Sequence, residues 1–145
     1  MSLKNLLGIS LDEIRADKAH VAKLLAAAER NIADAQLPGL STENRFDAAY
    51  KAIMQLAMLA LAANGYRTLT SKPGHHQTAI QTLPLTVGLS RPLVILLDAL
   101  RKQRNLADYS GDLVPDAIAV ECLTSAKELL AHMRAWLKAN KPELL

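Results

Sequence analysis

Cysteine, aromatic residues and long apolar runs are all scarce in this chain of 145 residues. The single cysteine, Cys122, excludes an internal disulfide and a zinc site built from cysteines. Aromatic residues make up only 3% of the chain, so a platform for stacking single-stranded bases is not expected. The longest apolar run, Ile53 to Ala63, contains Gln55 and is too short to span a bilayer. We therefore expect no contact with a membrane.

Alternating β-branched segments, which are typical of strands, are also missing. Alanine and leucine instead supply roughly a third of the residues, a composition that favours helices. The formal net charge of +3 is mildly basic, which is compatible with nucleic acid or an acidic partner but is not diagnostic. Acidic residues follow the first apolar residues and no small-residue cleavage site is visible, so a signal peptide is not expected. These features predict a helical, cytoplasmic protein.

Apolar residues recur at helical spacing in four long segments. These predicted helices cover residues 11–36, 42–64, 92–107 and 115–139. Ser10 and Ser41 are the expected N-caps of the first two, and acidic residues in the turns that follow suit the helix dipole. The segment HHQTAIQTL, which ends before Pro84, predicts a short helix. We expect one domain, residues 1–145, that is an all-α antiparallel four-helix up-and-down bundle with an extra short helix between long helices two and three.

The third long helix loses its apolar pattern in the segment DALRKQRNLADYSGD. Three leucines before that point share one narrow sector of the helical wheel: Leu93, Leu97 and Leu100. Arg104 falls in the middle of the same sector. One interpretation is structural, with the arginine stem on apolar surface and its head paired with Asp108, four residues later. The other is a pocket in which Arg104, Asn105 and Tyr109 bind an anion, because a guanidinium group suits phosphate.

The segment RKQRNLADYS near the end of this helix resembles the signature of HEPN domains (higher eukaryotes and prokaryotes nucleotide-binding). RFDAAYKAIMQLAMLALAANGYR, residues 45–67, is similar to the second helix of bacterial HEPN proteins, and the order of helices agrees over essentially the whole chain. The resemblance implies a helical bundle that is often dimeric. Many HEPN domains are metal-independent endoribonucleases. Others are non-catalytic modules that accompany nucleotidyltransferases in toxin–antitoxin pairs.

The HEPN nuclease motif is an arginine, a polar residue, three further residues and a histidine. Arg104 matches the arginine, Asn105 matches the polar residue, and Tyr109 stands where the family has histidine. Cleavage of RNA through its own 2′-hydroxyl needs a base, an acid and cationic stabilisation of the phosphorane. Tyrosine is a poor base near neutral pH, although it can donate a proton or a hydrogen bond. The resemblance implies Arg104 and Tyr109 as the catalytic residues of a degenerate ribonuclease.

Two adjacent histidines, His75 and His76, begin the predicted short helix. Neighbouring residues project about 100° apart on a helix, so this pair is not a chelating i, i+4 pair. They are either a solvated or capping pair, or part of a loop that folds over Arg104 and supplies the missing histidine. The candidate ligand-binding residues are therefore Arg101, Arg104, Asn105, His75 and His76. We expect no metal and no cofactor.

The other histidines and the cysteine have structural interpretations. His20 and His132 lie beside the apolar stripes of the first and fourth long helices, and Cys122 lies on the stripe of the fourth. A buried, inert thiol is therefore expected. Trp136 belongs to the core or to a dimer interface.

Two classes of function follow from these observations. The first is a HEPN-like RNA- or nucleotide-binding protein that retains or has lost ribonuclease activity. The alternative is a non-catalytic helical module that pairs with a nucleotidyltransferase or another protein. A DNA-binding regulator is less favoured because no two short helices are joined by a tight turn. The resemblance, and apolar residues such as Met58 and Ile95 outside the main stripes, predict a homodimer.

Overall fold

The computed structural model describes residues 2–145, and the protein is mostly helical (72%). Its α-helices are α1 (Lys18–Ala35), α2 (Thr42–Ala63), α3 (His75–Gln81), α4 (Leu83–Val87), α5 (Arg91–Ser110) and α6 (Asp116–Asn140). Short 3-10 helices, η1 (Leu3–Leu6) and η2 (Pro142–Leu144), lie near the two ends. A small antiparallel sheet joins β1 (Leu11–Glu13) to β2 (Tyr66–Thr68). The helical character is therefore confirmed, and the sheet is a feature that the sequence did not predict.

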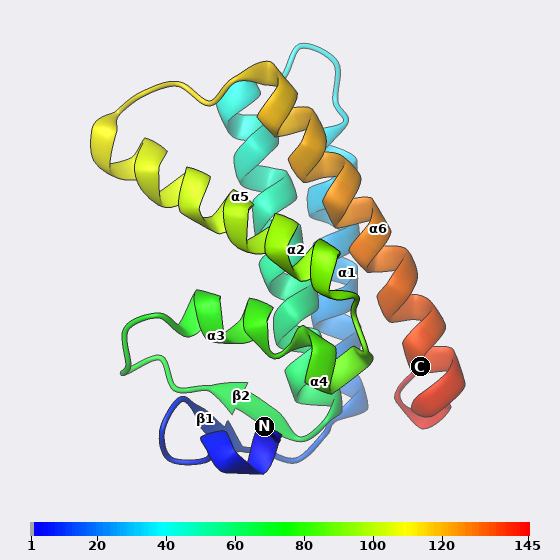
Figure 1. The fold of residues 1–145 in the computed structure, drawn as a ribbon. Helices are drawn as coiled ribbons and strands as arrows, with labels where there is room; N and C mark the ends of the chain where they lie inside the picture. Colours follow the sequence, from blue (N-terminus) through cyan, green and yellow to red (C-terminus); the bar gives the residue numbers. More distant parts are fainter. Residues whose placement is uncertain (1) are drawn as a thin grey trace.

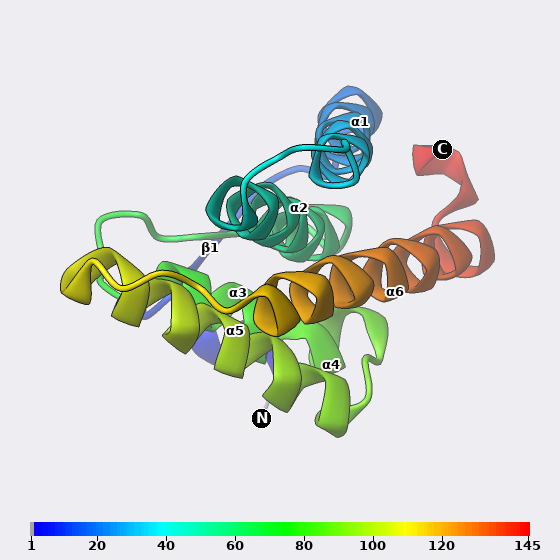
Figure 2. The same ribbon diagram turned by 90° about the horizontal axis from the view of Figure 1, so that it is seen from above.

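Helix α2 is the centre of the fold. It contacts α1, α6, β2 and the segment from α3 to α5. Figure 2 shows it between α1 on one side and α3 and α5 on the other. Alanines on several of its faces, such as Ala49, Ala52 and Ala57, are fully buried, so neighbouring backbones can approach closely. By length and composition α2 could cross a membrane, but 72% of its apolar window is buried within the protein.

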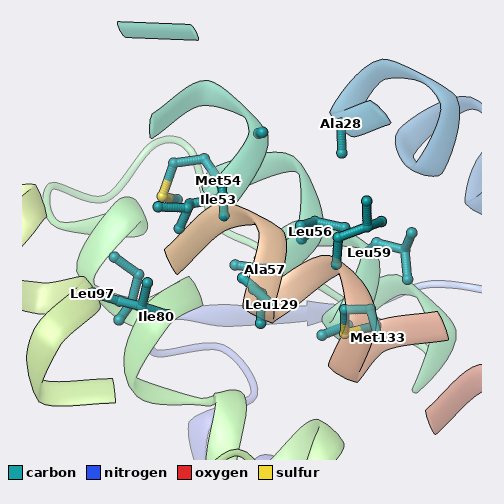
Figure 3. Close-up of a cluster of buried hydrophobic side chains, with 14 of the residues drawn as sticks. Ala28, Ile53, Met54, Leu56, Ala57, Leu59, Ile80, Leu97, Leu129 and Met133 are labelled. Carbon is teal, nitrogen blue, oxygen red and sulfur yellow. The ribbon is translucent and has the colours of Figure 1, made fainter. Parts of the chain in front are cut away.

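The main hydrophobic core lies where α2 meets its neighbours. Figure 3 shows side chains from five helices gathered there: Ala28 of α1; Ile53, Leu56 and Leu59 of α2; Ile80 of α3; Leu97 of α5; and Leu129 and Met133 of α6. Burial of this much apolar surface is the main stabilising contribution to a domain of this size. Elements far apart in the sequence are held together by this cluster.

Helix α5 differs from the other long helices in its placement. α1 runs antiparallel to α2, whereas α5 crosses in front of α2 obliquely (Figure 1). It packs on α3 and α4 as well as on α2 and α6. The sequence predicted a single short helix before α5, but the structure has two, α3 and α4, which meet at Thr82. Thr82 donates its hydroxyl to the carbonyl groups of Thr78 and Ala79, and Pro84 lies in the first turn of α4.

The first predicted helix is wrong over its first seven residues. Leu11–Glu13 forms β1 and pairs with β2, and α1 begins only at Lys18. Asp12, expected in the first turn of a helix, instead lies opposite Arg67, with 2.9 Å between its Oδ2 and the arginine Nη2. The prediction fails here because β1 pairs with a strand more than fifty residues away. Hydrophobic periodicity is a local pattern and carries no information about such a distant pairing.

Helix ends follow the expected chemistry in some places and not in others. Asp17, and not Ser10, caps α1, because its carboxylate accepts the N–H of Ala19 at 3.1 Å. Ser41 caps α2 as predicted, with its hydroxyl accepting a backbone N–H at 3.2 Å. Gly65 ends α2 with a φ of 88°, and a Cβ there would lie 3.3 Å from a backbone carbonyl oxygen. Glycine is therefore required for this turn into β2.

Candidate functional site

Arg104 continues the apolar face of α5, as the helical wheel predicted. Leu97 and Leu100 on that face are buried, and the Arg104 side chain that follows them is 33% exposed. Its Cζ atom lies 4.9 Å from the centre of the Tyr50 ring, which belongs to α2. A guanidinium group at this distance over an aromatic face is attracted by the ring quadrupole. The ring therefore holds the charged head at the edge of the core.

Tyr50 connects Arg104 to a histidine. Its ring is buried and stacks on Phe46 at a centroid distance of 6.3 Å. Its hydroxyl lies 3.3 Å from Nδ1 of His76, in the first turn of α3. Burial raises the pKa of Tyr50 to about 12, against a smaller opposing effect from Arg104. The hydroxyl therefore keeps its proton at neutral pH, and three elements, α2, α3 and α5, meet at one phenol ring.

Both sequence-predicted histidines lie at this place, half-buried. The rings of His75 and His76 are 4.7 Å apart in an edge-to-face arrangement. Burial lowers the pKa of His76 below its usual value, and the nearby His75, Arg104 and Arg101 lower it further. His76 is therefore neutral at pH 7. Of the two interpretations of this pair, the geometry favours the one in which its segment lies beside Arg104.

The predicted ion pair between Arg104 and Asp108 is present but loose. The arginine Nε lies 3.7 Å from the Asp108 Oδ2, and that carboxylate is 64% exposed. This separation exceeds hydrogen-bond distance, and solvent screens an exposed pair strongly. The ion pair with Asp108 therefore leaves most of the N–H donors of the Arg104 guanidinium group unused.

Two hollows of different charge have both Arg104 and Asp47 in their walls. One, of about 320 Å³, is lined by Asn31, Asp47, Ala48, Lys51 and Arg104. The other, of about 180 Å³, has several carboxylates in its wall, from Glu43, Asp47, Asp108 and Asp112. Like charges repel, so an anion is favoured on the Lys51 side and disfavoured on the acidic side.

The remaining residues of the predicted motif are less available to a ligand. Arg101 is held by Asp98, with 2.8 Å between its Nε and the carboxylate Oδ1, and both side chains are largely covered. Asn105 is exposed, and Tyr109 is 91% exposed and lines neither hollow. Five residues correspond to a rotation of about 140° on a helix, which turns Tyr109 away from Arg104. The geometry of the single chain therefore gives no support to Tyr109 as a catalytic partner of Arg104.

Sequence reasoning missed three residues of the site. In the sequence, Tyr50 follows Phe46 at helical spacing, which predicts a core residue and no functional role. Its hydroxyl was a usable signal, because a buried tyrosine needs a hydrogen-bond partner. Lys51 and Asn31 gave no signal, since a lysine or an asparagine on a helix surface is ordinary.

The structural interpretations of two other residues are confirmed. Cys122 is buried, and burial raises the pKa of its thiol to about 12, so the thiol is unreactive at neutral pH. His132 donates its Nε2–H to the carbonyl oxygen of Val87 at 2.6 Å, which ties α6 to the end of α4. His20 lies exposed on α1. Within residues 2–145, no group of three or more metal-ligating side chains is placed to hold a metal ion.

Comparisons with known protein families, curated proteins and solved structures found no match for this chain. The resemblance to HEPN domains therefore rests on the two segments quoted above. The functional argument rests on the geometry around Arg104.

Proposed function

We propose that this protein is a HEPN-like domain that binds a phosphate group of RNA or of a nucleotide in the hollow between Arg104 and Lys51. In this proposal α1, α2, α5 and α6 correspond to the four helices of an antiparallel up-and-down bundle, with α3 and α4 inserted between α2 and α5. RNA as a ligand and a single reduced, buried thiol both fit a cytoplasmic location.

The observation that carries the proposal is the state of the Arg104 guanidinium. It is held over a buried ring at 4.9 Å, it is partly exposed, and within residues 2–145 its one ion-pair partner stands at 3.7 Å. A planar guanidinium group with free donors is well suited to phosphate oxygens, which it can contact in pairs. Lys51 adds a second positive charge to the same hollow, so its two cations outnumber the one carboxylate there, that of Asp47. Its volume of about 320 Å³ suits one nucleotide unit rather than a long duplex.

Replacement of Arg104 with alanine is expected to weaken binding of a nucleotide or a short RNA by about 1.5–3 kcal/mol, the range for hydrogen bonds to charged groups. This corresponds to roughly a 10- to 150-fold increase in Kd. Isothermal titration or fluorescence anisotropy at two salt concentrations measures the change. Arg91→Ala is the matched control, because Arg91 is an exposed arginine at the other end of the same helix. Unchanged binding in a folded Arg104→Ala protein would contradict the proposed site.

The alternative function, a non-catalytic module for a nucleotidyltransferase or another protein, is favoured by the outer face of α5. Ile95 and Leu106 are each 60% exposed, and Tyr109 lies with them on one side of the helix. The exposed Lys102 lies in the same sector, and exposed apolar side chains interspersed with charge are typical of a protein–protein interface. Met58 is the other residue from which a dimer was predicted. It is half-buried, and its sulfur accepts a hydrogen bond from the Thr68 hydroxyl at 3.7 Å, so it adds no exposed apolar surface for an interface.

We propose that the occupant of this α5 face is a second copy of the chain, giving a homodimer. Sedimentation at micromolar concentration is expected to give twice the chain mass for the wild type. Leu106→Lys should shift the protein to a monomer, because it places a charge in the contact. Ile9→Lys, a change at an exposed position in the N-terminal segment, should leave the mass unchanged. A monomeric wild type would overturn the homodimer and leave the α5 face to the nucleotidyltransferase alternative.

A further inference from the structure

The outward side of α1 carries a basic hollow that the Arg104 site does not use. Figure 2 shows α1 at the edge of the fold, where it packs mainly on α2, α6 and η2. The hollow, called here the α1 hollow, has a volume of about 600 Å³. His20, Lys23 and Arg30 line it together with four small or apolar residues of the same helix, and the described residues in its wall include no carboxylate. Its charge therefore favours an anionic ligand.

Lys23 and Arg30 are available to such a ligand. Both side chains are exposed, and within residues 2–145 neither of them forms an ion pair with a carboxylate. Glu29, which is next to Arg30 in the sequence, instead pairs with Arg134 of α6 at 2.9 Å. Residues seven positions apart lie on the same side of a helix and about 10 Å apart along its axis. The two cations therefore suit two separate anionic groups better than a single one.

The α1 hollow continues into the hollow between Arg104 and Lys51. One row of α1 residues, spaced by four, three and four positions, connects them: His20, Leu24, Ala27 and Asn31. The first three line the α1 hollow, and Asn31 lines the hollow with Arg104 and Lys51. Asn31 also donates its Nδ2–H to Gln55 of α2 at 2.8 Å, which fixes the place where the two hollows meet. The row is about 16 Å long, so it can accompany a ligand that is longer than one phosphate group.

We propose that the α1 hollow is a second phosphate-binding site, in which Lys23 and Arg30 bind the backbone of an RNA strand that starts at Arg104. This inference rests on the proposed function and names its ligand as a single RNA strand rather than a free nucleotide. The contacts on α1 are to backbone phosphates, so they add affinity and direction but do not read the base sequence.

The side chains on this face favour a nucleic acid strand over an acidic protein segment. Protein interfaces are centred on large apolar or aromatic anchors. Among residues 2–145, none of the large apolar side chains that are exposed belongs to α1. Alanines such as Ala26 and Ala27 line the α1 hollow instead, so a phosphate backbone can approach the helix while the longer cationic side chains reach around it.

The test compares the binding of uridine monophosphate and of tetrauridylate, a short single-stranded RNA, to the full chain by isothermal titration. The wild type should bind tetrauridylate more tightly. Lys23→Ala/Arg30→Ala is expected to weaken binding of tetrauridylate by about 5- to 30-fold, the loss of two exposed ionic contacts. Its Kd for uridine monophosphate should stay within about twofold of the wild type, because that ligand reaches only the distant Arg104 and Lys51. Alanine favours helix, so the variant should fold.

Salt dependence provides a second measurement. Each phosphate contact with a single strand contributes about 0.7 to the slope of log Kd against log salt concentration, so the double variant should lose about 1.4. Arg91→Ala/Lys127→Ala is the matched control, because it removes one arginine and one lysine from exposed positions on α5 and α6. It changes the net charge equally and should leave the slope and the tetrauridylate Kd near those of the wild type.

The outcomes distinguish this inference from the function on which it rests. Equal affinities of the wild type for the two ligands, or equal effects of the double variant and its control, would overturn the α1 site and leave the Arg104 site intact. Binding of both ligands that does not change in Arg104→Ala would instead remove the proposed function. Loss of tetrauridylate affinity alone in Lys23→Ala/Arg30→Ala, with loss of affinity for both ligands in Arg104→Ala, would support both.

Discussion

Replacement of Tyr50 with alanine is expected to lower the free energy of unfolding by about 3–5 kcal/mol, the cost of truncating a large buried aromatic side chain. The Tyr50 ring is almost completely buried, stacks on Phe46, and lies 4.9 Å from the Cζ atom of Arg104. Its removal leaves a cavity beside α3 and α5 and also deletes the hydrogen bond to His76. Urea denaturation followed by circular dichroism measures the change.

Tyr50→Phe is the control for this result. It keeps the ring and its contacts, so only the net contribution of one hydrogen bond, about 0.5–1.5 kcal/mol, should be lost. If alanine and phenylalanine at this position destabilise the protein equally, the ring does not support the structure in the way described. A larger loss of stability for alanine would show that the Tyr50 ring, which lies next to Arg104, is also part of the core.

Leu129→Ala is expected to lower the free energy of unfolding by about 2–5 kcal/mol. Leu129 on α6 is completely buried in the core, where α6 contacts α2 (Figure 3). Alanines on α2 bring the helices close together, and this closeness limits how far the backbone can relax into the space left by a shortened side chain. Urea denaturation again provides the measurement.

The matched control for Leu129 is Leu37→Ala in the turn between α1 and α2. Leu37 is more than half exposed, so the same chemical change should alter stability by no more than about 0.5 kcal/mol. Similar losses at the two positions would indicate that burial at the contact between α2 and α6 does not dominate stability.

The helices that the sequence predicts best are those with strong local signals. α2 begins after the Ser41 cap and ends before Gly65, within one residue of the predicted bounds. The predicted helix at 115–139 agrees equally well with α6. In both cases a cap or a proline, a continuous apolar stripe and a terminating residue all indicate the same ends, so local information is sufficient.

Long-range contacts account for the errors in the fold. Residues 11–13 have helical periodicity with the segment that follows, yet they pair with β2, because Leu11 becomes completely buried in that arrangement. The oblique placement of α5 depends on α3 and α4 lying beneath it, and no pattern within α5 itself encodes a crossing angle. Tertiary packing therefore overrides local preference at both places.

The candidate site was predictable only in its central residue. The position of Arg104 among leucines is a local property of one helix, and the wheel placed it correctly on the inward face. The motif spacing suggested Tyr109 as its partner, but a single-chain helix turns that side chain into solvent. Tyr50 contacts Arg104 from α2, and His76 contacts Tyr50 from α3. The meeting of these three helices depends on the tertiary fold.

The central position of α2 also has a consequence for the chain as it is synthesised. α2 is apolar enough to be mistaken for a membrane span, and it leaves the ribosome well before α6, which is more than fifty residues further along. Until then α1, β2 and the segment from α3 to α5 can cover parts of α2, but the face that α6 covers stays exposed. Surfaces exposed during such a delay are the ones that chaperones bind and that aggregate when chaperones are scarce. The nascent protein therefore depends on protection of α2 until its last long helix has been made.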